Sequence, residues 1–419
     1  MYSKNLLLEE LSWRGMVYQH TDGLADALAT ESLSAYAGFD PTASSLHVGH
    51  LVPVMGLAHL QRGGHRPVAL VGGGTGMIGD PSGKTAERQL VSVEEIEANS
   101  KGLAKQLERF LDFSGPKAAL MRDNAAWLRP LKAVEFMRDV GKHFTVNYML
   151  AKDSVQSRIE GGISFTEFSY MLLQAYDFLE LNRRDGVTLQ IGGSDQWGNI
   201  TAGLELIRRV EGKTAHALTM PLVTTASGSK FGKTEAGAVW LDPARTSPYK
   251  FYQYWINVDD RDAGKYLRLF TLLPRKQIEE LDKKIESAPE KREAQQALAR
   301  DVTARVHGED AAKVAEQVSG VLFGKTEPTN LSEPVLRALS EEVPFADRLP
   351  NAGLLDVLVT LKLAASKSAA RRLVEQGGVY VNGQRADPET DLSTAKPLAG
   401  GFHLLRKGAR DYGLIKVSK

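Results

Sequence analysis

In the first half of the chain, short apolar runs alternate with stretches in which apolar residues recur at helical spacing. The apolar runs predict buried strands at 34–39, 67–71, 118–121 and 187–191. Helical spacing predicts helices at 48–61, 94–111 and 195–210. Strand, glycine turn and helix in repetition are typical of a parallel sheet with helices on both faces. Because ligands of such sheets bind at the carboxyl ends of the strands, we expect the chemistry in the loops there.

The second half of the chain has a different pattern. Residues 247–320 are helical in character, whereas residues 324–350 carry four prolines and little periodicity. An amphipathic helix at 354–363, a serine-capped helix at 366–377 and a strand at 379–382 follow, with Asn382-Gly383 as a turn signal. We therefore predict an α/β domain at 1–246, a helical domain at 247–323, a linker at 324–351 and a small α+β domain at 352–419.

The composition is that of a globular protein with little net charge. The 419 residues are 42% hydrophobic and 25% charged, with a formal net charge of +1. A uniformly basic coat for nucleic acid is excluded, but residues 352–419 hold 11 Lys and Arg against six Asp and Glu. With 0 cysteines, no disulfide or Cys-ligated metal can form, which fits a reducing cytoplasm. We find no signal peptide and no membrane-spanning run, so we expect a cytoplasmic protein without membrane contact.

The first candidate motif is His47-Val48-Gly49-His50, which follows Asp40-Pro41-Thr42 between a strand and a helix start. Imidazoles and backbone N–H groups at a helix N-terminus can face an anion. A metal site would need further ligands, and none is obvious nearby. The alternative is a helix start with two incidental histidines.

Two glycine-rich segments invite a phosphate-binding P-loop assignment. That pattern needs a glycine five residues before the Gly-Lys pair, where Ile78 and Ser227 stand instead, so both matches fail. Glycines after a strand still indicate close approach of the backbone to a ligand. Asp80, at the end of the first segment, could pair with an ammonium group.

A third motif lies on a predicted helix. Tyr170, Gln174 and Asp177 recur at i, i+4 and i+7, so they share one face of an otherwise apolar segment. Polar groups buried there need partners, which favours a pocket over an amphipathic helix with a solvated stripe.

Two further motifs suit a nucleotide. Gln190-Ile-Gly192-Gly193-Ser-Asp195-Gln196-Trp-Gly-Asn199 places an acid after a glycine pair, where it can accept from ribose hydroxyls. Lys230-Phe-Gly-Lys233-Thr234 puts two lysines in a loop rich in Ser, Gly and Thr, which suits a polyphosphate whose charge changes during reaction. A glycine turn and a solvated basic loop are the respective alternatives.

In this order, the motifs resemble those of the class I aminoacyl-tRNA synthetases. Residues 47–50 resemble the HIGH signature and 230–234 the KMSKS signature, from which the chain departs at Phe231, Gly232 and Thr234. Residues 36–42, 79–84, 170–177 and 192–199 resemble the bacterial tyrosyl branch in particular, which tolerates that variant. Residues 366–383 resemble the S4-type RNA-binding domain that ends such enzymes. The resemblance covers essentially the whole chain.

The resemblance implies a Rossmann-like catalytic domain, a helical domain and an S4-like RNA-binding domain. It also implies a tyrosine–tRNA ligase reaction, in which L-tyrosine and ATP give tyrosyl-adenylate and pyrophosphate. The tyrosyl group then passes to the 3′-terminal adenosine of tRNA(Tyr). ATP would enter as a substrate with Mg²⁺, and no tightly bound, protein-ligated metal is expected. The family further implies a homodimer.

The same resemblance implies roles for individual residues. The tyrosine-binding residues would be Tyr36, Asp80, Asn124, Tyr170, Gln174 and Asp177. The ATP-binding residues would be Asp40, Thr42, His47, Gly49, His50, Gly193, Asp195, Gln196 and Lys233. The catalytic residues around the phosphates would be His47, His50, Lys84, Arg88, Lys230, Lys233 and Thr234. The residues that contact tRNA would be Lys367, Arg371 and Arg372.

Within the tyrosine pocket, the resemblance implies that Tyr36 and Asp177 hydrogen-bond the substrate phenol, which explains specificity. A site built to bond a hydroxyl rejects an analogue that lacks it, because buried polar groups are left unpaired; tyrosine-specific synthetases are the usual example. Three alternatives stay open: a tryptophan-specific relative, an RNA-binding protein with a decayed synthetase domain, and, least favoured, a P-loop NTPase.

Overall fold

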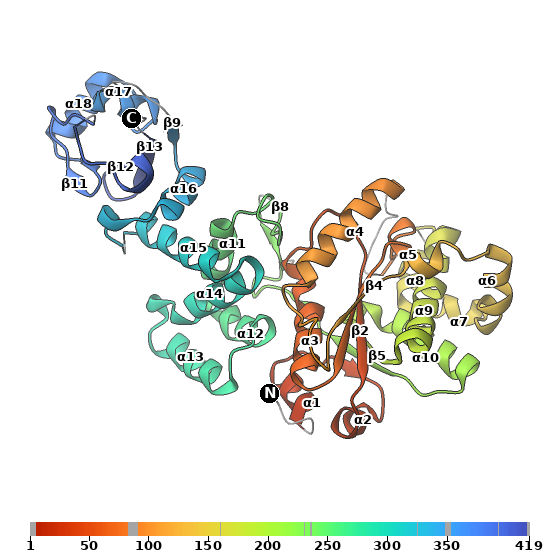
Figure 1. Cartoon of the computed structure of the whole chain (residues 1–419). Helices are drawn as coiled ribbons and strands as arrows, with labels where there is room; N and C mark the ends of the chain where they lie inside the picture. Colours follow the sequence, from red (N-terminus) through yellow and green to blue (C-terminus); the bar gives the residue numbers. More distant parts are fainter. Residues whose placement is uncertain are drawn as a thin grey trace. The chain divides into compact units, whose positions relative to one another are not determined.

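The computed structural model describes residues 6–82, 91–159, 161–229, 231–234, 237–324, 326–347, 353–392 and 394–416. The chain forms two compact units, whose elements are labelled in Figure 1. The first comprises Met1–Thr246 and Ile256–Val306, and the second comprises Ser247–Trp255 and His307–Lys419. No helix in this described part is long and apolar enough to cross a membrane.

A six-stranded sheet with the strand order β1-β6-β5-β2-β3-β4 forms the centre of the first unit. The strands are β1 (Gln19–His20), β2 (Ser34–Phe39), β3 (Arg66–Val71), β4 (Leu120–Asp123), β5 (Val187–Gly193) and β6 (His216–Met220). Neighbours are parallel except for β1, which pairs antiparallel with β6. The predicted parallel sheet is confirmed, and the four predicted strands overlap β2 to β5.

Helices lie on both sides of this sheet, as α3 and α9 show in Figure 1. The helices before the sheet's last strand are α1 (Leu7–Trp13), α2 (Leu24–Thr30), α3 (Leu51–Arg62), α4 (Val93–Leu107), α5 (Ala125–Leu128), α6 (Ala133–Asp139), α7 (Val146–Leu150), α8 (Asp153–Ile159), α9 (Phe165–Asp185) and α10 (Trp197–Glu211). Those after it in the first unit are α12 (Asp260–Phe270), α13 (Arg275–Ser287) and α14 (Glu293–His307).

The local sequence explains these elements. In β3 every residue after Arg66 is buried, as expected for a central parallel strand covered on both faces. The long helix α9 begins at Ser164, whose hydroxyl accepts from the Glu167 N–H, and ends at Gly186 in the left-handed region with φ 63°. Between these caps Phe178 is fully buried and packs edge-on against Tyr36 of β2.

The strand order reverses between β2 and β5. The chain passes outward from β2 through β3 to β4 and returns to β5 on the other side of β2. Such a reversal opens a crevice at the carboxyl ends of the strands, where ligands bind. Asp40 directly follows β2, Gly72 follows β3, Asn124 follows β4 and Ser194 follows β5. The predicted motifs therefore meet at one edge of the sheet.

The second unit is built on a five-stranded sheet with the order β11-β10-β12-β13-β9. Its strands are β9 (Phe345–Asp347), β10 (Val379–Val381), β11 (Gln384–Arg385), β12 (Phe402–Lys407) and β13 (Asp411–Lys416). Its helices are α11 (Pro248–Ile256), α15 (Glu309–Leu322), α16 (Glu333–Glu342), α17 (Leu354–Thr360) and α18 (Lys367–Glu375). The predicted turn at Asn382-Gly383 is present, since both residues have positive φ, 50° and 84°.

Alternate residues of the sheet enter two separate cores. Leu405 and Ile415 pack with α17 and α18, whereas Leu404 and Leu414 pack with α15 and α16.

The structure therefore divides the chain differently from the predicted segments. The predicted linker at 324–351 contains α16 and β9, which belong to the second unit, and the predicted helical domain at 247–323 is shared between both units. The prolines of this segment favoured the prediction of a linker. The apolar side of α16 becomes apparent only where the helix packs against the sheet.

Within the first unit, Arg14 joins α1 to the end of α12. Its side chain is 0% exposed and pairs with Glu10 at 2.7 Å. The two terminal nitrogens donate to the carbonyl oxygens of Arg268, Thr271 and Leu273 at 2.8 to 3.1 Å. The guanidinium thus satisfies carbonyl groups that the end of α12 leaves without helical partners.

Arg14→Met should lower the free energy of unfolding by about 3 kcal/mol, because buried carbonyls and Glu10 lose their donor. Urea unfolding followed by circular dichroism measures the change. Arg275→Met is the matched control, since Arg275 lies over the same Trp13 ring but its side chain is 47% exposed. Equal losses in the two variants would contradict the role given to Arg14.

Candidate active site

The deepest part of the site lies between β2 and α9. The Asp177 carboxylate accepts from Asn124 Nδ2 at 2.9 Å and from Trp127 Nε1 at 2.7 Å. Tyr36 is 1% exposed, and among the described residues its hydroxyl has no hydrogen-bond partner. A buried hydroxyl without a partner is costly unless a ligand supplies one.

The electrostatics of this pocket are unusual. Burial raises the pKa of the Asp177 carboxyl to about 8, although the hydrogen bonds from Asn124 and Trp127 lower it. Burial, and then the charge of Asp177, raises the pKa of Tyr36 well above its usual value. A carboxyl that exchanges its proton near neutral pH can accept a hydrogen bond from a phenol or donate one to it.

A second set of hydrogen bonds lies above this pocket, around Asp40. Its carboxylate accepts from Thr75 Oγ1 at 2.7 Å and from the Tyr170 hydroxyl at 2.8 Å. Asn124 Nδ2 donates to Thr75 Oγ1 at 2.9 Å and so joins this set to Asp177. Gly72 is required here, because a Cβ at that position would lie 2.0 Å from Asp40 Oδ1.

A third set surrounds Asp80. Gln196 Nε2 donates to Asp80 Oδ2 at 2.6 Å, and the Ser82 N–H donates to Oδ1 at 2.9 Å. Gln174 Nε2 donates to Gln196 Oε1 at 3.2 Å, and Asn199 Nδ2 donates to Gln174 Oε1 at 3.1 Å. Three segments that are far apart in sequence thus share one network.

The residues predicted to bind tyrosine and those predicted to bind ATP meet in these networks. Tyr170, from the first group, bonds to Asp40 of the second. Gln196, from the second group, bonds to Asp80 and Gln174 of the first. An amino-acid carboxylate and a nucleotide α-phosphate bound by the two groups would therefore be neighbours, which is the geometry that acyl-adenylate formation requires.

The 47–50 segment forms a short 3-10 turn, Val48–His50, that precedes α3. His47 Nδ1 accepts from the Gly49 N–H at 3.0 Å, and His50 Nδ1 accepts from the His47 N–H at 3.1 Å. An Nδ1 that accepts carries no proton, so each neutral ring has its N–H at Nε2. Both histidines are thereby arranged as hydrogen-bond donors.

Residues 231–234 lie against this turn. Phe231 stacks on Phe270 with ring centroids 5.0 Å apart and anchors the loop on α12. Gly232 has a φ of 78°, and a Cβ there would lie 2.6 Å from Val48 Cγ2. The backbone of Gly232 is therefore packed directly on the His47–His50 turn, although the two motifs are far apart in the chain.

The remaining predicted residues are placed as follows. Thr42 and Gly49 are exposed, Gly193 ends β5, and Asp195 lies in the turn Ser194–Gln196 that precedes α10. Lys233 and Thr234 form the exposed strand β7, which pairs with Gly237–Ala238 (β8). Lys367, Arg371 and Arg372 are exposed on α18 of the second unit. Lys84, Arg88 and Lys230 lie outside the described residues.

Sequence reasoning assigned no role to four residues of the networks. Thr75 links Asp40 to Asn124, Trp127 donates to Asp177, Asn199 donates to Gln174, and the Ser82 N–H donates to Asp80. Asn199 stood within a recognised motif but received no role. The sequence does not indicate a role in the site for Trp127, because an aromatic residue at that position is expected simply as part of the hydrophobic core.

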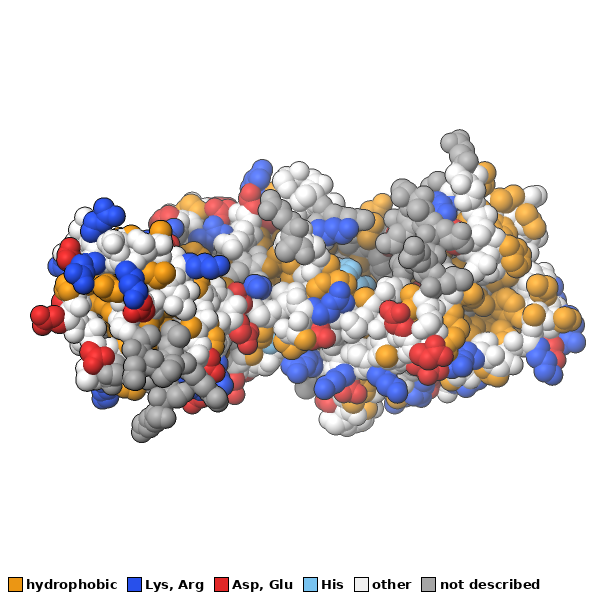
Figure 2. Space-filling view, turned by 90° about the horizontal axis from the view of Figure 1, so that it is seen from above, with side chains coloured by type: hydrophobic (Ala, Val, Ile, Leu, Met, Phe, Trp, Pro, Cys, Tyr) orange, Lys and Arg blue, Asp and Glu red, His pale blue; other side chains and the backbone are white. Residues whose placement is uncertain are grey.

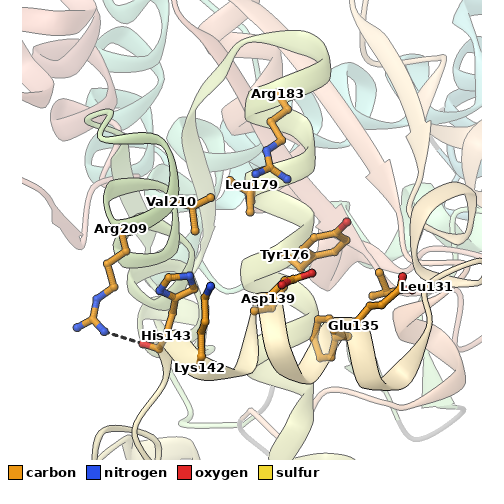
Figure 3. A pocket seen from close by; sticks show the side chains of 12 residues that line it. Leu131, Glu135, Asp139, Lys142, His143, Tyr176, Leu179, Arg183, Arg209 and Val210 are labelled. Atoms are coloured by element: carbon orange, nitrogen blue, oxygen red, sulfur yellow. Dashed lines mark hydrogen bonds between the residues drawn. The ribbon is translucent and has the colours of Figure 1, made fainter.

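A separate hollow of about 580 Å³ lies on the other face of α9 (Figure 3). Tyr176, Leu179 and Arg183 line it, on the side of the helix opposite Tyr170, Gln174 and Asp177. It contains none of the predicted site residues. The described ranges also hold no group of three or more His, Asp or Glu side chains that could bind a metal ion.

Comparisons with known proteins agree with this geometry. Residues 28–324 match the family model of tRNA synthetases class I (W and Y), and residues 336–415 match the tyrosine–tRNA ligase SYY-like C-terminal domain. A tyrosine–tRNA ligase of Roseiflexus castenholzii is 55% identical, over 98% of this chain and 99% of its own length. One from Geobacillus stearothermophilus is 52% identical, over 98% and 100%.

Solved structures give the same result. A C-terminally truncated mitochondrial tyrosyl-tRNA synthetase of Aspergillus nidulans matches with a TM-score of 0.69 and 30% identity, over 76% of this chain and 94% of that one. A tryptophanyl-tRNA synthetase of Encephalitozoon cuniculi matches with a TM-score of 0.54 and 16% identity, over 73% and 87%, which shows the fold alone. The fold and site define a class I aminoacyl-tRNA synthetase. The chain belongs to the family of tRNA synthetases class I that comprises the tryptophan and tyrosine enzymes.

Gly232→Ala should lower the rate of adenylate formation roughly tenfold, because the added methyl group displaces the loop from Val48. Gly228→Ala is the matched control: Gly228 has the same φ of 78°, but a Cβ there meets nothing within 4 Å. Measuring ATP–pyrophosphate exchange for both separates the contact from backbone strain. Similar losses in the two variants would mean that contact with Val48 is unimportant.

Proposed function

We propose that this chain is the tyrosine-specific member of its family, a tyrosine–tRNA ligase. It activates L-tyrosine with ATP and transfers the tyrosyl group to the 3′-terminal adenosine of tRNA(Tyr). The observation that carries the choice of amino acid is the buried Tyr36 hydroxyl, which has no partner within the described ranges and lies next to the Asp177 carboxyl. A substrate phenol can hydrogen-bond to both groups, whereas phenylalanine leaves the Tyr36 hydroxyl without a partner and adds no hydrogen bond to Asp177. An indole fits this pair less well, since its N–H is a donor only.

The networks around Asp40 and Asp80 support the first half-reaction. Asp80, Tyr170 and Gln174 would hold the substrate ammonium group, with Asn124 as the support that orients the carboxylates. A tyrosine carboxylate oxygen attacks the α-phosphorus, and the bond from that phosphorus to the pyrophosphate oxygen breaks. No protein nucleophile is needed, so catalysis consists of positioning and charge stabilisation.

The nucleotide would lie along the carboxyl ends of β2 and β5. Asp195 and Gly193 would hold the ribose, Gly49 would lie by the adenine, and His47 and His50 would donate to the phosphates. Thr42 would face the phosphates with these histidines, Gln196 would lie near the reacting α-phosphate, and the leaving pyrophosphate would be held by Lys84, Arg88, Lys230, Lys233 and Thr234. Asp40, which also belongs to the proposed ATP site, accepts from Thr75 and Tyr170. Mg²⁺ would arrive with the nucleotide as part of the substrate, bound to its phosphate oxygens.

The second half-reaction needs tRNA, and the second unit is the proposed contact. Arg371 and Arg372 are exposed and ordered on α18, and Lys367 pairs with Asp356 on the same surface. Such a basic surface binds the phosphate backbone. We also propose a cytoplasmic location, since an enzyme that charges tRNA works where proteins are synthesised.

A homodimer is the proposed assembly. Large apolar side chains are exposed close together in the sequence of the first unit, and Figure 2 shows a hydrophobic area at the end where α6 to α8 lie. These residues, with their exposed fractions, are Val134 (79%), Met137 (58%), Val146 (61%), Ile159 (43%) and Phe165 (73%). An apolar area of this kind on one protomer is typical of an interface, and a second copy would bury it symmetrically.

Asp177→Ala should abolish tyrosine-dependent ATP–pyrophosphate exchange in a folded protein. Tyr36→Phe should weaken tyrosine activation by roughly 0.5–1.5 kcal/mol, the worth of one neutral hydrogen bond, and reduce discrimination against phenylalanine. Values of kcat/KM for tyrosine, phenylalanine and tryptophan test both. Tyr176→Phe, on the opposite face of α9, is the control and should behave as wild type. Unchanged tyrosine kinetics in Asp177→Ala, or a preference for tryptophan in the wild type, would refute the proposal.

Replacing Lys367, Arg371 and Arg372 by alanine in the full chain should raise KM for tRNA and reduce its salt dependence by about one unit of slope for each lost phosphate contact. Exchange without tRNA should not change. The charge-matched control removes Lys250, Lys313 and Arg337, three other exposed cations of the same unit. Truncation at 350 is unsuitable, because it would remove the strands that cover α15 and α16. A normal KM for tRNA in the α18 variant would exclude this surface.

The double variant Val134→Glu and Met137→Glu should be monomeric in sedimentation velocity at concentrations at which the wild type is a dimer, because charges cannot be buried at the interface. Tyr18→Glu with Phe113→Glu changes two other exposed apolar residues and should leave the dimer intact. A wild type that sediments as a monomer at micromolar concentration would contradict the assembly.

A further inference from the structure

A short segment, Val239 to Leu241, joins the His47–His50 turn to residues 231–234. The Val239 N–H donates to the Gly232 carbonyl, and the Val239 carbonyl accepts from the Val48 N–H, both at 3.0 Å. The Leu241 N–H donates to the Leu46 carbonyl at 2.9 Å. Trp240, between these two residues, forms an isolated antiparallel bridge with His47. The indole is thus presented to the histidine by the backbone itself.

The side chains continue this contact outward. The Trp240 ring meets the His47 ring edge-on, with centroids 5.8 Å apart. The centroids of the His47 and His50 rings are 4.0 Å apart. On the Trp240 ring, the Arg245 guanidinium carbon lies 3.3 Å from the centroid. Arg245 Nη1 also donates to Ser44 Oγ at 3.3 Å, in the loop that leads to His47.

We propose that Trp240 and Arg245 are positioning residues, which hold the His47 imidazole in the orientation that serves the reacting phosphates. The hydrogen bond that His47 Nδ1 accepts from the Gly49 N–H fixes the tautomer of the ring. The indole edge contacts the imidazole and restricts its tilt, and the Arg245 cation fixes the indole through a cation–π contact. This inference rests on the proposed function, since it assumes that His47 acts on ATP.

The surroundings distinguish this role from plain packing. Trp240 is only partly buried, and Arg245 is exposed, so neither belongs to the hydrophobic core of the first unit. Losing either side chain should therefore change stability little. A displacement of about 1 Å in a group that acts on a transition state can reduce a rate by as much as a hundredfold. The effect should accordingly appear in kcat rather than in the melting temperature.

The experiment is a double-mutant cycle on the full chain, read by tyrosine-dependent ATP–pyrophosphate exchange. Trp240→Leu should lower kcat by roughly tenfold to a hundredfold, whereas the Kd for ATP stays within about twofold of wild type. Trp240→Phe, which keeps a ring edge, should recover most of the loss. Arg245→Met should show a smaller loss than Trp240→Leu, and Arg245→Lys, which keeps the cation, should recover it. Arg261→Met, which removes an exposed arginine that pairs with Asp259, is the control.

The second arm of the cycle uses His47→Asn, because the Asn oxygen can still accept from the Gly49 N–H and preserve the turn. In this background Trp240→Leu should lower kcat by less than about threefold, since the group it positions is already gone. An equal loss in both backgrounds, or a loss of Kd in proportion to kcat, overturns the inference. Those results leave the proposed function standing, whereas a wild type without tyrosine-dependent exchange overturns both.

Discussion

The burial of carboxylates at the carboxyl ends of the parallel strands is the constraint on which the first unit depends. Asp40 and Asp177 lie where β2 and α9 converge, and a charge there is tolerated only if donors surround it. Asn124 meets this need for Asp177 and, through Thr75, for Asp40. Because Asn124 also accepts from the Gly74 N–H at 2.7 Å, the glycine loop after β3 is held in the same network. The same hydrogen bonds therefore hold the proposed binding residues in place and connect the elements of the fold.

This arrangement leaves the Tyr36 hydroxyl without a partner among the described residues, next to the Asp177 carboxyl, and both are proposed to bind the substrate phenol. A protein pays for such a feature with stability, because groups that a ligand will satisfy are left incompletely satisfied without it. The raised pKa of Asp177 has the same origin, since burial outweighs the two donors. Specificity for a phenol is thus a property of the buried environment rather than of any single residue.

The second unit is held together in a different way, by one sheet that packs on both faces. Alternate residues of β12 and β13 supply two cores, so the small α+β domain cannot be separated from α15 and α16 without exposing Leu404 and Leu414. The basic residues of α18 lie on the outside of the other core. The surface proposed to bind tRNA can thereby vary in charge without affecting the packing beneath it.

The sequence alone determined the elements and the chemistry that each could carry. Short apolar runs located β2, β3 and β5, because buried parallel strands are largely apolar, and glycines marked the ends of the runs for β3 and β5. The spacing of Tyr170, Gln174 and Asp177 gave a shared helix face, because helical periodicity is local.

Only the tertiary structure decided which groups meet. The bonds from Tyr170 to Asp40, from Trp127 to Asp177 and from Val48 to Val239 join residues that are distant in the chain. The same holds for α16 and β9, whose place in the second unit depends on partner strands that follow more than fifty residues later. Local pattern carries propensity and periodicity, whereas contacts between distant segments arise from the packing of the whole chain.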